Sequence, residues 1–407
     1  MIVEDSYLVP PNVADYMSVR SLRLRGTDEE MGRELAELAR RDYGTALTRY
    51  ADPAYAAARV AYLDRNHPTL AARARGVAEV FGLAPGDTVF DTSILAYDGP
   101  ARPACSAVFV PAALTTTGHP LIGRNMDWYL LRMSRLAGLP AGPDEHLSCS
   151  RTVLLSTTSE SGRTALQLGS HDMLSPGYDG MNEAGLMIAL LVDHQGAGNP
   201  GASPAGGFAH GLSSMQLVGY VLATANTVAE AKQALLTQHF FVPTPEGQHW
   251  LIADATGAAT VFEIDGKTRQ YHFVDACDNA PLVMTNHALH TYPTLESFPQ
   301  VDPGKEHDSF VRYRMLTDAV AAHSGPWSPD DVNALLDVVL CAFVDNTAAG
   351  VAGGMPERTL WNYLADPVAR SYRFRFHQHD EGPEPGTNHM RVRRTDPIEV
   401  SMDSVLA

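Results

Sequence analysis

A series of short β-prone segments begins at Cys105 and constrains the fold more than any other feature of this sequence. The segments read SAVFVPAAL, TVLLSTT, TALQLG, LMIALLVD, HWLIADA, ATVFEID, QYHFVD, PLVMTN and YRFRFH. Several are bounded by Gly, Asp-Gly or Pro, as hairpin turns require. Helical patterns form separate runs at residues 213–238, 309–323 and 329–343 instead of alternating with single strands. The pattern therefore predicts an α+β fold, in which helices pack outside antiparallel sheets.

Before Cys105 the chain is expected to be mainly helical. Thr27 precedes DEEMGRELAELARR, which has acidic residues in its first turn and arginines in its last, as helix termini favour. Helical periodicity returns at residues 55–63 and 69–81. We therefore predict a helical segment over residues 1–104, followed by a β-rich domain over residues 105–407.

Composition argues against several classes of function. The 407 residues carry a formal net charge of −17, which disfavours binding to nucleic acid or to an anionic membrane surface. No apolar run approaches the roughly eighteen residues of a membrane helix, and the first residues lack a signal-peptide pattern. The four cysteines form no CxxC pair, and no phosphate-binding glycine motif follows a strand. We expect a cytoplasmic protein that acts on a small molecule without a cofactor, either as a monomer or as a homo-oligomer.

The segment ACSAVFVPAALTTTGHPLIGRNMDW, residues 104–128, is predicted to form a β-hairpin. One strand starts at Cys105, the turn falls in TTTG, and the second strand returns through GRNMDW. Such a hairpin brings Arg124 and Asp127 back beside Cys105. The sequence thus predicts that a thiol, a guanidinium and a carboxylate meet at one strand end.

This trio suits a nucleophilic cysteine. An ordinary thiol has a pKa of about 8.5 and is mostly protonated at neutral pH. Cleavage of the chain before Cys105 would free an α-amino group with a pKa of about 7.7–8.0, which can accept the thiol proton without a histidine. In that arrangement Asp127 would orient the ammonium group, and Arg124 would favour the thiolate.

Two later segments carry further candidates. Asp179-Gly180 and Gly185, within YDGMNEAGLMIALLVD, predict a tight turn into a buried strand. Asn286 ends the run PLVMTN, where a side-chain amide can point into a site and donate a hydrogen bond to an oxyanion.

Together these segments resemble the acyl-coenzyme A:6-aminopenicillanic acid acyltransferase family, a relative of the choloylglycine hydrolases within the N-terminal-nucleophile superfamily. The shared pattern is a cysteine that opens the catalytic chain, then GRNxD, GMNExGL, TNH and a helix with an arginine near its start. Here the pattern reads Cys105, GRNMD at 123–127, GMNEAGL at 180–186, TNH at 285–287 and Arg312. With GTDEEMGRELAEL, RGVAEVFGL and RTLWNYLADPVARSYRF, the resemblance spans roughly residues 20–376.

The resemblance implies a four-layer αββα sandwich. It also implies a precursor that cuts itself between Ala104 and Cys105, so that residues 1–104 become a pro-region or small subunit. Cys105 would then be the nucleophile, and its freed amine would be the base.

The resemblance implies roles for four further residues. Arg124 and Asp127 would organise the nucleophile, Asn286 would donate to the oxyanion, and Arg312 would position these groups without contacting the substrate. One position departs from the pattern. The choloylglycine branch has an asparagine after the GMNExGL strand, where this chain has Val192, with the neighbouring aspartate or a backbone amide as substitutes. The departure argues against bile salts as substrates.

Simpler structural interpretations compete with these roles. Arg124 and Asp127 would form a plain ion pair, Asn286 would cap a turn, and Arg312 would reach solvent from its helix. The histidine pairs in NHALH and HQH lack the HExxH spacing of a zinc helix, so we expect no catalytic metal. No GxSxG elbow supports serine hydrolase chemistry.

The leading prediction is attack of Cys105 on a linear amide, followed by hydrolysis of the acyl-thioester. An acyltransferase that passes the acyl group to an amine shares every step up to deacylation, so catalytic residues do not separate the two. A non-catalytic binding protein on the same fold is the alternative from another class. Such a protein would show no selective alkylation of Cys105 near neutral pH.

Overall fold

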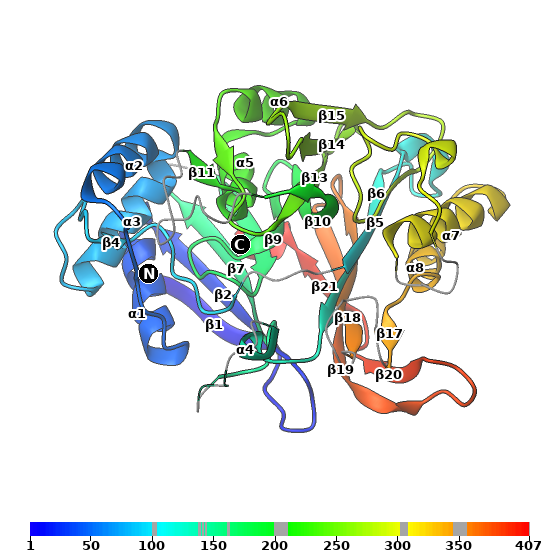
Figure 1. Cartoon of the computed structure of the whole chain (residues 1–407), viewed down its shortest axis with the longest axis horizontal. Helices are drawn as coiled ribbons and strands as arrows, with labels where there is room; N and C mark the ends of the chain where they lie inside the picture. Colours follow the sequence, from blue (N-terminus) through cyan, green and yellow to red (C-terminus); the bar gives the residue numbers. More distant parts are fainter. Residues whose placement is uncertain are drawn as a thin grey trace.

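Two large β-sheets pack face to face in the computed structural model, and helices cover their outer faces (Figure 1). The structure describes residues 1–99, 104–136, 145–160, 163–198, 211–301, 308–344 and 356–406, together with residues 140 and 142. In Figure 1, α1–α3 lie at the left and α7 and α8 at the right, with the sheets between them. The predicted α+β class and four-layer αββα sandwich are confirmed.

The larger sheet has nine strands in the order β1-β2-β7-β8-β9-β10-β13-β14-β15. β2 and β7 pair in parallel, whereas the other neighbours pair antiparallel. The strands are β1 (Ile2–Val9), β2 (Ser18–Gly26), β7 (Arg151–Ser159), β8 (Thr164–Gly169), β9 (Gly177–Asn182), β10 (Met187–Ala197), β13 (Glu246–Ala253), β14 (Ala259–Ile264) and β15 (Tyr271–Asp275).

The second sheet has eight strands, in the order β16-β5-β6-β18-β19-β20, with β17 paired to β18 and β21 paired to β19. The strands are β5 (Ala104–Val110), β6 (Leu121–Tyr129), β16 (Leu282–Met284), β17 (Ala342–Phe343), β18 (Glu357–Asp366), β19 (Ser371–Pro383), β20 (Met390–Arg394) and β21 (Ile398–Ser401). Two short pairs lie apart from both sheets: β3 (Thr48–Arg49) with β4 (Phe90–Asp91), and β11 (Leu212–Ser213) with β12 (Phe240–Phe241).

Helices α1, α5, α7 and α8 contact the outer faces of the sheets, α1 and α5 on the nine-stranded sheet and α7 and α8 on the other. The α-helices are α1 (Asp28–Asp42), α2 (Pro53–Asn66), α3 (Pro68–Val80), α4 (Met133–Leu136), α5 (Leu217–Thr224), α6 (Val228–Leu236), α7 (Ser309–Ala322), α8 (Pro329–Asp337) and α9 (Met402–Leu406). The predicted start of α1 is confirmed: Thr27 Oγ1 accepts from Glu30 N at 3.2 Å, and Glu30 Oε2 accepts from Thr27 N at 2.9 Å.

Strand β5 contributes to the core on both of its faces, and this places the candidate nucleophile. Cys105, Ala107 and Phe109 join the large apolar core that includes residues of both sheets, whereas Val108 and Val110 join a smaller cluster with residues of α7 and α8. Successive side chains in a strand point to opposite faces, so the Cys105 thiol points between the sheets. All seven residues of β5 are buried.

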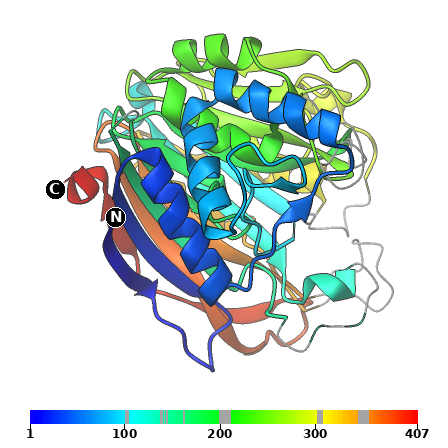
Figure 2. The same cartoon turned by 90° about the vertical axis from the view of Figure 1, so that its left-hand side faces the viewer.

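The N-terminal segment is less helical than the sequence indicated. Besides α1–α3 it supplies β1 and β2, and β2 pairs with β7 along all nine of its residues. Figure 2 shows α1 lying across these strands, with the two chain ends close together. Arg23 Nη1 donates to Ser404 O at 2.7 Å, which joins the beginning of the chain to its end.

Two predicted helices also differ from the structure. The stretch 213–238 is divided into α5 and α6, because the chain is extended at Ala225 and Thr227 starts a new helix as its N-cap. Asn182 Nδ2 donates to Ala225 O at 2.7 Å and so satisfies a carbonyl at the break. The helix predicted over 329–343 ends at Asp337, and residues 342–343 pair with β18 instead.

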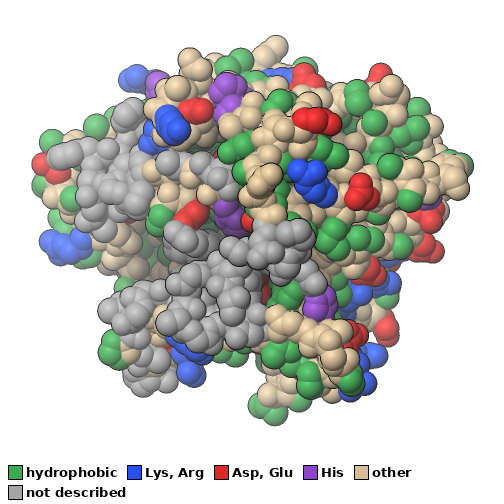
Figure 3. Space-filling view, turned by 45° about the vertical axis from the view of Figure 1, so that its right-hand side comes forward, with side chains coloured by type: hydrophobic (Ala, Val, Ile, Leu, Met, Phe, Trp, Pro, Cys, Tyr) green, Lys and Arg blue, Asp and Glu red, His purple; other side chains and the backbone are tan. Residues whose placement is uncertain are grey.

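The surface carries charges of both signs. On the described part of the face in Figure 3, acidic and basic side chains are interspersed with hydrophobic ones. Among the described residues, no helix combines the length and the apolar character needed to cross a membrane.

Candidate active site

The predicted hairpin of β5 and β6 brings Arg124 beside Cys105. The antiparallel register sets Cys105 opposite Met126 and Arg124 opposite Ala107, so the thiol and the guanidinium share the face that is directed toward the other sheet. Arg124 Nη2 lies 3.5 Å from Cys105 Sγ. Both side chains are completely buried.

Arg124 pairs with residues of the nine-stranded sheet and not with Asp127, three residues later in the sequence. Its Nε lies 2.9 Å from Asp179 Oδ1 in β9, and its Nη2 donates to Leu190 O in β10 at 2.8 Å. Burial by itself lowers the pKa of Arg124, but Asp179 and the Cys105 sulfur raise it overall. The guanidinium therefore stays charged. Its contacts join the two sheets next to the thiol.

Asp179 is a site residue that the sequence interpretation missed. It was assigned to a tight turn, but it lies within β9, and the turn follows at 182–185, where Gly185 has φ +80°. Trp361 Nε1 and Tyr363 Oη donate to the Asp179 carboxylate at 3.1 and 3.0 Å. Asp179-Gly180 is a typical turn pair, so no local signal indicated that this carboxylate is buried, where it requires a charged or donating partner.

Asp127 lies on the opposite face of β6 from Arg124. Its register partner is Ala104, the residue that precedes Cys105. Thr359 Oγ1 donates to Asp127 Oδ1 at 2.6 Å. The structure therefore brings together the thiol and the guanidinium as predicted, places the carboxylate beside the backbone of residue 104, and gives Arg124 a different acidic partner.

Asn286 binds the backbone of Cys105. Its Oδ1 accepts from Cys105 N at 2.7 Å, and its Nδ2 donates to Val192 O at 2.6 Å. His194 N donates to Asn286 O at 2.8 Å, so the end of β10 holds this residue through both its side chain and its backbone. At the position where the resemblance departs from the family pattern, the carbonyl of Val192 thus contacts the Asn286 amide.

Arg312 points into the protein and not into solvent. It lies near the start of α7, is almost fully buried, and donates from Nη1 to Cys105 O at 2.6 Å and to Ser106 Oγ at 2.8 Å. Its Nη2 donates to Asn286 Oδ1 at 2.7 Å. The planar guanidinium thus joins α7, the first strand of the hairpin and Asn286 in one network.

The start of α7 also supports the backbone around Asn286. Asn286 N donates to Ser309 Oγ at 2.7 Å, and the same hydroxyl lies 2.8 Å from His287 Nδ1. Thr285 Oγ1 donates to Ser309 O at 3.0 Å. The residues of TNH are therefore fixed individually, which explains why a short motif can define one geometry.

Burial keeps the Cys105 thiol protonated while the backbone before it is continuous. Burial raises the pKa of the thiol to about 12; Arg124 and Arg312 oppose this shift, and Asp127 and Asp179 add to it. A buried thiol of this kind is a poor nucleophile until a nearby group takes its proton.

Two mainly antiparallel sheets lie between helical layers, and a buried cysteine with two arginines around it opens an internal strand, as in the N-terminal-nucleophile fold class. Comparison of the sequence with protein-family models identifies one family. Residues 105–333 match the linear amide C–N hydrolases of the choloylglycine hydrolase family. The match covers more than half of the chain and begins at Cys105, so the protein belongs to this family and is an amide-hydrolysing enzyme.

The expected relationship to choloylglycine hydrolases is confirmed, whereas the match is not to the acyltransferase family itself. Similar solved structures include a mutant conjugated bile acid hydrolase from Clostridium perfringens, with 16% identity, a TM-score of 0.44, and coverage of 72% of this chain and 92% of that one. Another is penicillin V acylase from Agrobacterium tumefaciens, with 21% identity, a TM-score of 0.40, and coverage of 66% and 82%. Comparison with curated proteins gives no match.

Proposed function

We propose that Cys105 is the nucleophile of this amide hydrolase and that the enzyme is activated by cutting its own chain before Cys105. The main observation behind the proposal is that side chains contact the sulfur, the backbone nitrogen and the carbonyl oxygen of Cys105. Arg124 lies at its sulfur, Asn286 accepts from its nitrogen, and Arg312 donates to its carbonyl. A cysteine that serves only packing has no need for contacts at all three groups.

In the activation step, the peptide bond between Ala104 and Cys105 is replaced by a thioester. Cys105 Sγ attacks the carbonyl carbon of Ala104, the C–N bond to Cys105 breaks, and a thioester forms while the nitrogen becomes an amine. Water then hydrolyses the thioester, which leaves a carboxylate on Ala104 and restores the thiol. Asp127 is the register partner of Ala104, and this supports a role for its carboxylate in binding the new ammonium group. In this proposal residues 1–104 form a pro-region or small subunit.

The new amine then acts as the base in each turnover. It takes the Sγ proton, the thiolate attacks the substrate carbonyl, and the proton passes to the departing amine. Asn286 Nδ2 has two N–H groups, of which one is directed to Val192 O, so the other is the proposed donor to the oxyanion. Water releases the acid from the acyl-thioester and regenerates the thiol.

The test begins with denaturing electrophoresis and N-terminal sequencing of the purified protein. We expect fragments of about 11 and 33 kDa from a chain of 44.0 kDa, the larger one starting Cys-Ser-Ala-Val. Cys105→Ala should remain uncut, whereas Cys277→Ala, at an exposed cysteine, should be cut normally. Cutting of Cys105→Ala at the same bond would refute the proposed nucleophile.

Substrate turnover is measured with a series of N-acyl amides, with and without an added amine acceptor. Free acid as the product supports hydrolysis, and an acylated acceptor identifies a transferase. Mass spectrometry of a quenched reaction should find the acyl group on the fragment that begins with Cys105. An acyl group on another residue, or turnover by Cys105→Ala, contradicts the scheme.

A further inference from the structure

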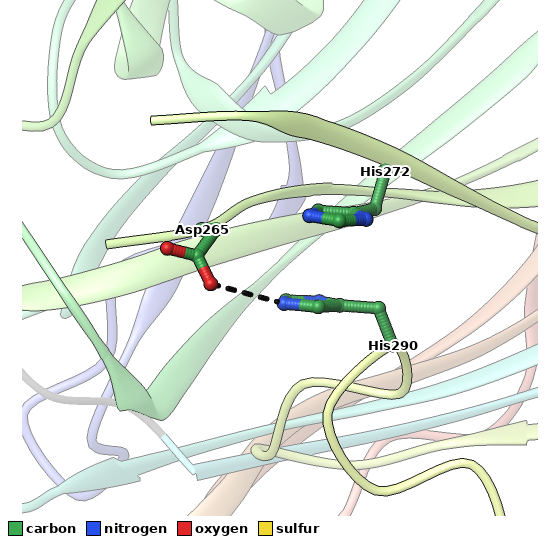
Figure 4. A group of neighbouring side chains, drawn as sticks. All are labelled: Asp265, His272 and His290. Carbon is green, nitrogen blue, oxygen red and sulfur yellow. Dashed lines mark hydrogen bonds and ion pairs between the residues drawn. The ribbon is translucent and has the colours of Figure 1, made fainter. Parts of the chain in front are cut away.

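Two histidines and an aspartate gather at one end of the nine-stranded sheet. Asp265 follows β14, His272 lies in β15, and His290 lies in the segment that follows Asn286. Their ligand atoms all lie within 4.8 Å of one another, and Figure 4 shows the two imidazole rings stacked beside the carboxylate. The ring centroids are 4.0 Å apart, and the ring planes differ by 4°.

A buried carboxylate fixes the orientation of His290. Glu263 Oε2 lies 2.7 Å from His290 Nδ1 and also accepts from His290 N at 2.8 Å. The Glu263 side chain is 1% exposed. When His290 Nδ1 donates to this carboxylate, Nε2 presents its lone pair to the cluster. Histidines that bind metals in proteins are commonly held in this way.

Asp265 is oriented in a complementary manner. Its Oδ1 accepts from Lys267 N at 2.8 Å and from Thr268 N at 2.6 Å, which anchors the carboxylate in the turn after β14. Its Oδ2 lies 3.4 Å from His290 Nε2. Hydrogen bonds outside the cluster therefore hold two of the three donor residues. Thr291 Oγ1 lies 3.1 Å from His290 Nε2, and a metal would have to displace this contact.

We propose that Asp265, His272 and His290 form a Zn²⁺ site with an open fourth position. Two imidazoles and one carboxylate are a ligand set that suits zinc, with Zn–N distances of about 2.0–2.1 Å. Binding requires His272 to rotate out of the stack until a ring nitrogen faces the other two donors. This side chain is partly exposed and lies on β15, the last strand of the sheet, so its rotation leaves the interior of the sheet unchanged.

The proposed ion would join the β14–β15 hairpin to the segment that carries Asn286. Glu263 already connects these elements, because its Oε1 accepts from Leu289 N at 2.7 Å and lies 3.1 Å from His249 Nδ1 in β13. Zinc would therefore stiffen the support of Asn286, four residues before His290, without entering the reaction. This effect on activity rests on the proposed role of Asn286, whereas zinc binding itself does not.

The experiment titrates the metal-free protein with Zn²⁺ by calorimetry and measures the thermal midpoint with and without the ion. We expect one Zn²⁺ per chain with a Kd below about 10 µM, and a higher midpoint in its presence. Co²⁺ should give the visible absorption bands of a low-coordinate site. His272→Ala and Asp265→Asn should weaken binding at least tenfold, and both positions lie outside the proposed active site.

His119→Ala is the matched control, because His119 also pairs with an aspartate, Asp366, at 2.9 Å but belongs to no such group among the described residues. This variant should bind Zn²⁺ as the wild type does. The proposal is overturned if the wild-type protein takes up no stoichiometric Zn²⁺, or if His272→Ala and Asp265→Asn bind it equally well. If the protein binds zinc but hydrolyses amides at the same rate with and without the ion, the zinc site stands and its proposed effect on Asn286 is refuted.

Discussion

The ion pair between Arg124 and Asp179 joins the two sheets at the thiol, and both side chains are almost completely inaccessible to solvent. Asp179→Asn would leave the Arg124 guanidinium buried without its carboxylate. We expect the free energy of unfolding to fall by about 3–5 kcal/mol, the usual result of removing one partner of a buried pair. Urea denaturation measures the change.

The control for this variant is Glu79→Gln, at an exposed carboxylate that lies 2.6 Å from Arg33 Nη2. Exposed pairs contribute about 0–1 kcal/mol, so its free energy of unfolding should change by no more than that. Equal losses in the two variants would show that the inter-sheet pair contributes no more than a surface pair.

The pKa of Cys105 leads to a second prediction at this scale. Burial raises it to about 12 in the continuous chain, so only about one thiol in 10⁵ is ionised at pH 7, and the ionised fraction rises about tenfold per pH unit. We expect the uncut chain to react slowly with iodoacetamide near neutral pH and faster as the pH rises. The cut chain, with an amine beside the sulfur, should react near neutral pH.

A fluorescent iodoacetamide labels the thiols of the cut and uncut chains in one experiment. A denaturing gel then separates the two, because the cut fragment and the uncut chain differ in mass. The measurement uses a Cys277→Ala background, because Cys277 is the exposed cysteine, whereas Cys149 and Cys341 are buried. Rapid labelling of uncut Cys105 at pH 7 would contradict the predicted shift of its pKa.

Among the elements, α7 has the closest connection with the site. Arg312 projects inward to Cys105 O and Asn286 Oδ1, whereas Arg314, two residues later, is exposed and donates to Leu295 O at 3.2 Å. Lysine lacks the planar fork that reaches both acceptors. We predict that Arg312→Lys lowers kcat/KM about 10²-fold, mainly through kcat, because misplacing the reacting groups has that magnitude of effect.

Arg314→Lys keeps the same helix and the same type of substitution, and it should leave both kinetic constants unchanged. Circular dichroism and the thermal midpoint establish that each variant is folded. A rise in KM alone for Arg312→Lys would assign Arg312 to substrate binding and contradict its positioning role.

Local sequence patterns were sufficient to predict the hairpin that carries Cys105 and the capped start of α1. Both depend on residues close together in sequence: the strands of the hairpin are joined by the ten residues 111–120, and Thr27 caps its own helix. Asp179 was missed for the opposite reason. Its partner Arg124 lies in the other sheet, and no local pattern records which faces of two sheets meet.

Long-range pairing also explains the missed N-terminal strands. In β2, Leu22 and Leu24 alternate with arginines, which is a strand pattern, but β1 is an edge strand in which only Val9 is buried. β2 becomes part of the sheet only by pairing with β7, more than a hundred residues later. The αββα sandwich was predicted through the family resemblance, because the strand runs alone indicated antiparallel sheets and not their number of layers.

At the scale of the whole molecule, residues 1–104 and the rest of the chain share one core. β2 is hydrogen-bonded to β7, Arg59 Nη1 donates to Gly211 O at 2.8 Å, and Asp98 accepts from Cys149 N at 2.6 Å. If the chain is cut before Cys105, separating the fragments would expose the buried apolar residues of β2 and α1–α3. At about 25 cal/mol per Å² of apolar surface, that exposure is strongly unfavourable.

We therefore predict that the two fragments stay associated after cleavage. Size-exclusion chromatography under native conditions should give one species that contains both fragments in equal amounts, and they should separate only in denaturant. Arg59→Ala removes the buried hydrogen bonds to Gly211 O and Gln216 Oε1 that join the two fragments, and should lower the denaturant concentration at which they separate. Elution of a free fragment of about 11 kDa from the native wild-type protein would mean that residues 1–104 act as a removable pro-region, and that the nine-stranded sheet persists without β1 and β2.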